Sequence, residues 1–176
     1  QAAVIRDALK ELDRAEPFKK WNVMAEKQMN TLRGQLSYQI KEFEQADKYF
    51  QNSLNLDPIT VAMKMARAYQ RGDMEEVAKL YKKGTKRFKK DKGVLLYALY
   101  SWILVPEDRV DDAIHVLEDA KDKTHHTVLR KNWEHLVNGR TRQFSNAGLG
   151  DQWYALHLET PRPVRVKQRR GKMRRR

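Results

Sequence analysis

The histidines of this chain are the side chains whose spacing comes closest to a metal site. His125 and His126 are adjacent, and His135 follows further along the chain. Neutral imidazole is the commonest metal ligand in proteins. We expect these three positions to lie on different helical faces, so the sequence predicts solvated or packing histidines and no metal site.

Paired carboxylates are the second group that could support chemistry. Asp111 and Asp112 are adjacent, as are Glu118 and Asp119. The first pair stands at the start of a predicted helix, where negative charge complements the helix macrodipole. Nothing in the pattern nominates any of the four as a general acid or base.

Several other hallmarks of catalysis are missing from the sequence. The chain has no Cys, which removes disulfides, thiolate nucleophiles and cysteine-ligated zinc. It has no phosphate-binding loop and no HExxH motif, and the GLGD stretch at 148–151 is not a dinucleotide-binding fingerprint. We therefore predict a protein that is not an enzyme and that needs no metal or cofactor.

Composition favours an almost wholly helical fold. The chain of 176 residues is 40% hydrophobic and 34% charged, with only 8 Gly and 5 Pro to interrupt its elements. The longest apolar run, VLLYALYSWILV at 94–105, would form about 18 Å of helix. A membrane core is about 30 Å thick, so we expect a buried helix that is covered on both sides.

The positive charge is unevenly spread. Formal net charge is +13, from 36 basic and 23 acidic residues. Residues 162–176 hold nine of the basic residues and no acidic one, which leaves 27 basic and 23 acidic residues in the first 161. The body is therefore close to balance, and the tail is too charged to fold alone.

A short pattern recurs three times along the chain. The segments EFEQADKYFQNSL, DMEEVAKLYKKGT and RVDDAIHVLEDAK each place a small, a large and a small residue at relative positions 0, +4 and +7, which share one helical face. An apolar helix and a short turn precede each segment. The positions that carry this pattern are Ala46, Phe50 and Ser53; Val77, Tyr81 and Gly84; and Ala113, Leu117 and Ala120.

The pattern resembles the tetratricopeptide repeat, a 34-residue helix–turn–helix unit. The second unit departs from that pattern by a shorter turn and no closing Pro, and the third by a longer turn. No unit has Trp at the usual place in its first helix, where Asn30, Ala62 and Tyr97 stand. The first unit matches best, with the expected types at Gly34, Ala46, Phe50, Leu54, Leu56, Asp57 and Pro58.

The resemblance implies an all-α fold, a right-handed superhelical array of antiparallel helix pairs. Three such pairs would occupy residues 27–123, because one pair cannot bury its apolar face alone. We expect an N-terminal helical segment at 1–26. A capping helix, a loop and a short helix would follow at 124–161, with Trp153 and Leu156 docked on the array. A basic tail at 162–176 would be disordered or extended.

In the tetratricopeptide family, the first helices line a groove that accepts a peptide or a partner's helix. Carried over by position, this groove would suit an acidic or amphipathic protein segment. Two other interpretations remain open: the cations only solubilise an exposed face, or the ends of the chain fill the groove. The carried-over positions are Gln35, Tyr38, Met63, Lys64, Arg67, Arg71 and Trp102.

The tail could bind an anionic membrane surface, nucleic acid phosphates or an acidic protein patch, or it could only solubilise the chain. It has no aromatic residue, so base stacking is not expected. We predict a non-catalytic interaction scaffold in the cytoplasm or on the cytoplasmic face of a membrane complex; the alternative is an RNA- or DNA-associated protein. The basic residues of the tail are Arg162, Arg165, Lys167, Arg169, Arg170, Lys172, Arg174, Arg175 and Arg176.

Overall fold

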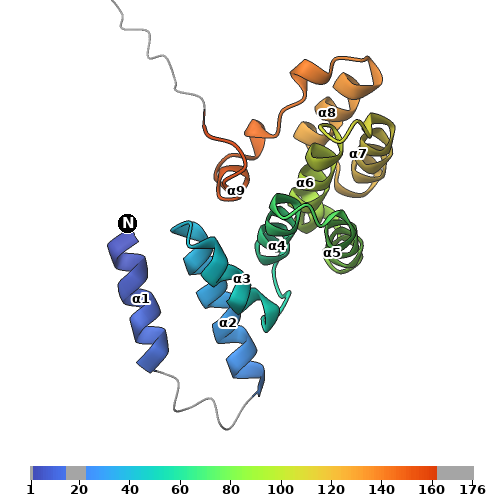
Figure 1. Cartoon of the computed structure of the whole chain (residues 1–176). Helices are drawn as coiled ribbons and strands as arrows, with labels where there is room; N and C mark the ends of the chain where they lie inside the picture. Colours follow the sequence, from blue (N-terminus) through green and yellow to red (C-terminus); the bar gives the residue numbers. More distant parts are fainter. Residues whose placement is uncertain (1, 15–22, 162–176) are drawn as a thin grey trace, which may run out of the picture.

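A computed structural model describes residues 2–14 and 23–161 of the chain. Within these ranges the chain is helical and contains no strand, so the predicted all-α class is confirmed (Figure 1). The basic tail lies outside the described residues. In chain order the elements are α1 (Ala2–Arg14), α2 (Val23–Gln39), α3 (Phe43–Gln51), α4 (Pro58–Gln70), α5 (Met74–Arg87), η2 (Lys90–Gly93), α6 (Val94–Leu104), α7 (Val110–Thr124), α8 (Thr127–Val137), η3 (Thr141–Gln143), η4 (Ala147–Leu149) and α9 (Asp151–Tyr154).

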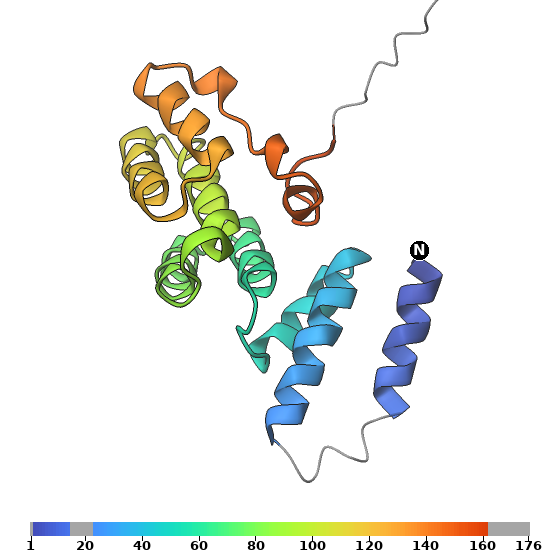
Figure 2. The same cartoon turned by 180° about the vertical axis from the view of Figure 1, so that it is seen from behind.

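Consecutive helices pack side by side. α2 packs on α3, α4 on α5, α6 on α7 and α7 on α8, and α9 returns toward the earlier helices (Figures 1 and 2). Capping carboxylates, a proline and a glycine define the turns that precede α4 and α5. Asp57 accepts a hydrogen bond from the Thr60 amide at 2.8 Å to cap α4, and Pro58 occupies its first turn. Asp73 caps α5 in the same way, after Gly72 has taken a positive φ of 76°.

The recurring small–large–small pattern marks the contact face of α5 and α7, whereas α3 ends at Gln51, so Ser53 lies beyond the helix that the sequence predicts for it. Ala46, Val77 and Ala113 are each completely buried. The helices approach so closely that a Cβ added to Gly34 would lie 2.5 Å from Cε1 of Phe50. A Cβ on Gly84 would lie 2.6 Å from Cδ1 of Leu96. A larger residue at either position would require the neighbouring side chain to move, and the rigid ring of Phe50 has less freedom to do so than the end of Leu96.

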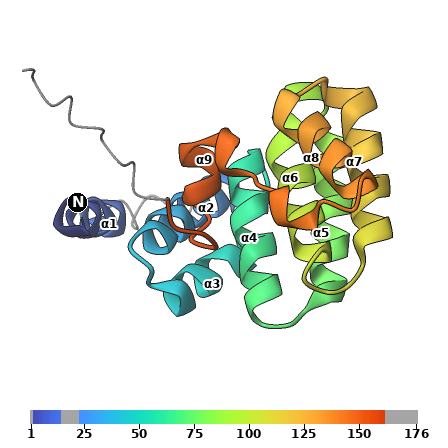
Figure 3. The same ribbon diagram turned by 90° about the horizontal axis from the view of Figure 1, so that it is seen from above.

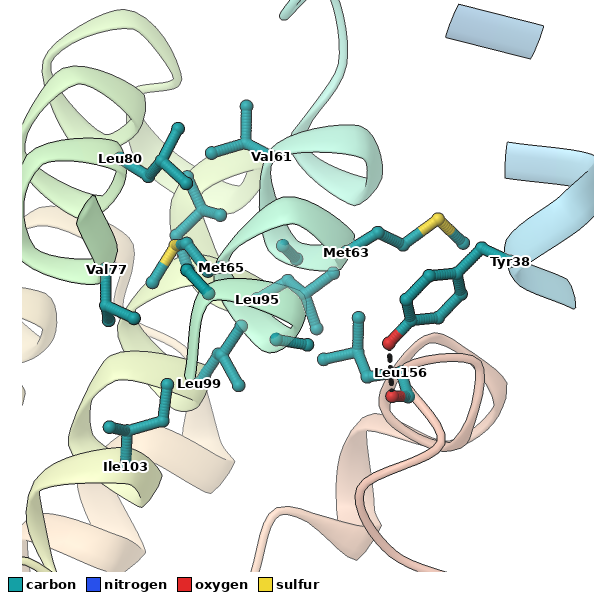
Figure 4. Close-up of a cluster of buried hydrophobic side chains, with 14 of the residues drawn as sticks. Tyr38, Val61, Met63, Met65, Val77, Leu80, Leu95, Leu99, Ile103 and Leu156 are labelled. Atoms are coloured by element: carbon teal, nitrogen blue, oxygen red, sulfur yellow. Dashed lines mark hydrogen bonds between the residues drawn. The ribbon is translucent and has the colours of Figure 1, made fainter. Parts of the chain in front are cut away.

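The apolar run of 94–105 forms α6, the most enclosed helix among those described. It packs against α4, α5, α7 and α8. Its two faces enter different hydrophobic clusters. Leu95, Leu99 and Ile103 join the cluster of α2–α5 and α9 (Figure 4), and Leu96 belongs to the same cluster. Other residues of α6 join the cluster of α7 and α8. The buried hydroxyl of Ser101 donates to the carbonyls of Tyr97 and Ala98 within its own helix. Burial on both sides, expected from the sequence, is confirmed.

No helix in the described part of the chain combines the length and apolar character needed to cross a membrane.

The Gly34–Phe50 contact gives a stability prediction. Gly34→Ala should lower the free energy of unfolding by about 1–3 kcal/mol, because the new methyl group overlaps the Phe50 ring. At an unconstrained helix position the same change would stabilise the protein by about 0.5–1 kcal/mol. Chemical denaturation measures the difference.

A double-mutant cycle tests the assigned cause. Phe50→Leu removes Cε1, the ring atom nearest to the added methyl group, and replaces a rigid ring by a more flexible side chain. Gly34→Ala should therefore cost less in the Phe50→Leu background than in the wild type. Equal costs in both backgrounds would contradict overpacking as the cause.

Candidate functional site

The structure divides six of the seven predicted groove residues into two groups, and the seventh, Gln35, lies apart from both. Tyr38, Met63 and Trp102 lie on a face formed by α2, α4 and α6, where Tyr38 and Met63 are buried. Lys64, Arg67 and Arg71 line a separate, open hollow between α3, α4 and α5. Gln35 links α2 to the start of α4 by donating to the Thr60 hydroxyl at 2.7 Å and to the Asp57 carboxylate at 3.3 Å.

The first group is covered by residues 147–161, which we call the C-terminal segment. This segment lies beside α2 and α4 (Figure 3). Its Trp153 and Leu156 side chains are completely buried, as the sequence predicts. The Tyr38 hydroxyl donates to the Leu156 carbonyl at 2.6 Å (Figure 4). Burial raises the pKa of Tyr38 well above its usual value, so the phenol remains a neutral donor.

Two indole groups hold the end of this segment. Glu159 accepts a hydrogen bond from Nε1 of Trp102 through one carboxylate oxygen and from Nε1 of Trp153 through the other, each at 2.7 Å. The two indole rings meet edge to face, with their centroids 5.7 Å apart. Trp102 thus binds a residue of its own chain.

His157 completes the contact with α2. Its ring stacks on Tyr38 with a centroid separation of 5.6 Å and meets Phe43 edge to face. Burial lowers the pKa of His157, and the positive charge of Lys41 lowers it further, so the stacked imidazole is neutral at pH 7. The expectation that Tyr38, Met63 and Trp102 are presented to an external partner is therefore corrected, because the chain's own end covers this face.

The second group lines what we call the cationic hollow, a depression of about 630 Å³. Phe50 and Leu80 contribute apolar side chains to its lining, and both side chains are largely buried. They are 6% and 7% exposed, so the hollow offers positive charge with a small apolar area beside it. Its lining residues are Asp47, Phe50, Gln51, Ser53, Asn55, Lys64, Arg67, Arg71, Glu76 and Leu80.

Asp47 fixes both arginines of the hollow. Its carboxylate accepts from Nε and Nη2 of Arg67 at 2.8–3.2 Å, and it lies 3.0 Å from Nη1 of Arg71. The Arg67 guanidinium also sits 4.8 Å from the centroid of the Phe43 ring. The exposed fraction of the side chain is 13% for Arg67 and 48% for Arg71, so Arg67 is the structural member of the pair and Arg71 the accessible one.

Within the described part of the chain, Lys64 has no carboxylate in direct contact, unlike Arg67 and Arg71. Its ammonium donates to the amide oxygen of Asn55 at 2.7 Å. Burial lowers its pKa, and the more distant carboxylates of Glu76 and Asp57 oppose that shift only in part. A carboxylate brought to this point would therefore strengthen the charged form of Lys64.

The histidines and paired carboxylates that could have supported chemistry do not come together in one site. His126 caps α8 by accepting from the Val128 amide, whereas His125 ends α7 in a left-handed conformation. Asp119 pairs with Lys123 and accepts from the Tyr97 hydroxyl. Among the described residues no three His, Asp or Glu side chains gather as metal ligands would.

Sequence reasoning missed Asp47 and Glu159, the two acids that organise these faces. Each is a single carboxylate in an ordinary helical or turn context, and no spacing rule marks it. The only signal for these acids was their position. Asp47 lies on the helix that faces the cations of α4, and Glu159 follows Trp153 closely in the sequence.

No protein-family model, curated protein or solved structure matches this chain. The tetratricopeptide resemblance therefore rests on the residues of its three units and remains a prediction.

Arg67 and Arg71 should differ in their effect on stability. Arg67→Ala should lower the free energy of unfolding by about 1–3 kcal/mol, because it leaves the half-buried Asp47 with fewer donors. Arg71→Ala should cost at most about 1 kcal/mol, as for exposed ion pairs. Urea denaturation at one pH compares them, and equal losses would contradict the division of roles.

The indole contacts of Glu159 should stabilise the C-terminal segment. Glu159→Gln should lower the melting temperature, because an amide offers one carbonyl oxygen in place of two charged acceptors. Trp153→Ala should lower it further, because deleting a buried Trp costs about 3–5 kcal/mol. Melting followed by circular dichroism gives the order. The segment is not part of the cooperative fold if both variants melt with the wild type.

Proposed function

We propose that the chain is a non-catalytic interaction scaffold of the tetratricopeptide type, in which antiparallel helix pairs stack into a right-handed superhelical array. Its partner would be a protein that presents an acidic or amphipathic segment, and the cationic hollow would receive that segment. The observation that carries the proposal is the meeting of Lys64 and Arg71 with the apolar groups of Phe50 and Leu80 in one open depression.

The lining of the cationic hollow holds fewer carboxylates than cations. Two carboxylates, Asp47 and Glu76, face three cations among its lining residues. Asp47 is already shared by Arg67 and Arg71, and Glu76 forms an ion pair with Lys79 at 2.8 Å. A partner carboxylate would therefore add a charge-assisted hydrogen bond at Lys64 or Arg71 without displacing a contact that stabilises the fold.

An amphipathic partner would gain slightly more than a purely acidic one. Phe50 and Leu80 are only 6% and 7% exposed, so apolar side chains of the partner would remove a small further area of them from water, at about 25 cal/mol per Å². Carboxylates on the same face of the partner, one helical turn away, would reach Lys64 and Arg71. Electrostatic attraction would mainly set selectivity and the association rate.

The covered face of α2, α4 and α6 supports the same proposal by exclusion. The C-terminal segment already satisfies the polar groups of Tyr38 and Trp102 there. A partner at that face would have to displace buried Trp153 and Leu156, whereas the cationic hollow is open to an incoming segment.

A defined peptide pair tests the proposal. A labelled helical peptide with Glu and Leu on one face should bind the wild-type chain, and a peptide with Gln for every Glu should bind far less. Lys64→Gln combined with Arg71→Gln should weaken binding of the Glu peptide about tenfold, or about 1.4 kcal/mol. Fluorescence anisotropy at constant ionic strength measures both affinities.

The matched control removes two exposed cations elsewhere. Arg130→Gln with Lys131→Gln on α8 changes net charge by the same amount. This control should leave the affinity for the Glu peptide within about twofold of the wild type. Equal weakening by the two double variants would mean that the peptide senses overall charge, and it would refute the assignment of the hollow.

A further inference from the structure

A second concentration of positive charge lies in the body of the chain, between the end of α5 and the start of α6. Seven of the residues at 82–92 are basic and one, Asp91, is acidic. Without this stretch, the first 161 residues hold 20 basic and 22 acidic residues, so the net positive charge of the body resides here. We call this group the basic surface; its members are Lys82, Lys83, Lys86, Arg87, Lys89, Lys90 and Lys92.

The basic surface is exposed and not neutralised by the rest of the fold. All seven side chains belong to exposed residues. None of them forms an ion pair with an acidic residue inside the described ranges, unlike Arg67, Lys79 and Lys123, which do. The helix macrodipole at the end of α5 accounts for Lys86 and Arg87, since cations are favourable in a last turn. It does not account for the cations beyond the helix.

Part of this surface is concave. A pocket of about 420 Å³ opens among Lys86, Lys89 and Lys90, with Thr85, Phe88, Tyr97 and Lys123 completing its lining. Lys123 is held by Asp119 at 2.7 Å, and the Tyr97 hydroxyl donates to the same carboxylate at 3.0 Å. The three lysines therefore provide the positive charge that this pocket offers to a ligand.

The chemistry of the lining defines the class of ligand. Phe88 and Tyr97 are 7% and 2% exposed, so neither ring offers a face on which a base could stack. Lysine ammonium groups bind anions as point charges without the planar fork that arginine provides. A ligand that suits this surface carries closely spaced negative charges and needs no base-specific contact.

We propose that the basic surface binds the phosphate backbone of a single-stranded nucleic acid, independently of sequence. Such a strand carries one full charge per nucleotide, about 3.4 Å apart along its axis in a stacked strand, and releases counterions when lysines neutralise it. It can follow a concave surface, which a flat bilayer cannot. Of the described residues with a large exposed apolar side chain, none lies within 82–92, where it could insert into a membrane beside the cations. This site is separate from the cationic hollow and does not depend on it.

Quantitative binding of a labelled oligouridine of about sixteen nucleotides tests the proposal, with the full chain including its tail in every arm. Lys86→Gln, Lys89→Gln and Lys90→Gln together should weaken binding at least tenfold. The plot of log affinity against log salt concentration should become less steep by about 0.7 for each phosphate that is no longer neutralised. An unlabelled oligothymidine should compete, because the protein binds the backbone.

The control variant removes three exposed cations from other elements: Lys27→Gln, Lys48→Gln and Arg140→Gln. Its net charge equals that of the test variant, so the basic tail and the overall field act equally on both. It should bind the oligonucleotide within about twofold of the wild type. Equal weakening by the two triple variants would overturn the proposal, because binding would then follow net charge alone.

Two further probes separate the classes of polyanion. Poly-glutamate and vesicles that contain phosphatidylserine are each titrated with the wild type and the test variant. The decrease in affinity should be largest for the oligonucleotide. If the affinity for poly-glutamate or the vesicles falls as much or more, the surface is a general or lipid-directed polyanion site and the proposal fails.

Folding is checked by circular dichroism and thermal melting of each variant. If the test variant melts below the wild type, Lys83→Gln and Lys89→Gln replace it as single changes at exposed positions. Each should weaken oligonucleotide binding about two- to threefold, as expected when one phosphate is no longer neutralised. Unchanged binding by both single variants would overturn the proposal.

Discussion

The enclosure of α6 is the constraint on which the rest of this structure depends. A helix that is apolar all round cannot leave any side in water, so it must be covered from both directions. α4 and α5 cover one side, and α7 and α8 cover the other. The two hydrophobic clusters thus meet along one helix, so burial of α6 requires neighbouring helices to pack on both of its sides.

The C-terminal segment extends the same principle to a face that helices alone would leave open. Tyr38 and Trp102 bring polar groups to this face, and the segment provides an acceptor for each in the Leu156 carbonyl and Glu159. Burying these rings without partners would carry a desolvation cost. The C-terminal segment leaves other positive charge accessible, at the cationic hollow and at the basic surface.

Periodicity in the sequence was sufficient to predict the helices and their contact faces. The spacing of Ala46, Val77 and Ala113 identified three equivalent positions, and the structure buries all three. Periodicity could not predict what would cover a side chain such as Met63, because that depends on where residues 147–161 pack in the folded chain. The basic surface was overlooked for a related reason: near-balance of charge over the whole body concealed a local excess at 82–92.

The Glu159 contacts also have a mechanical consequence. The tail begins two residues after Thr160, so tension applied to it reaches Glu159 before any of the longer helices. The hydrogen bonds to Trp102 and Trp153 would resist that pull first, and the Tyr38 contact next. A tether fixed to the tail would therefore peel the C-terminal segment away stepwise, and the surface uncovered would be the aromatic face of α2 and α6.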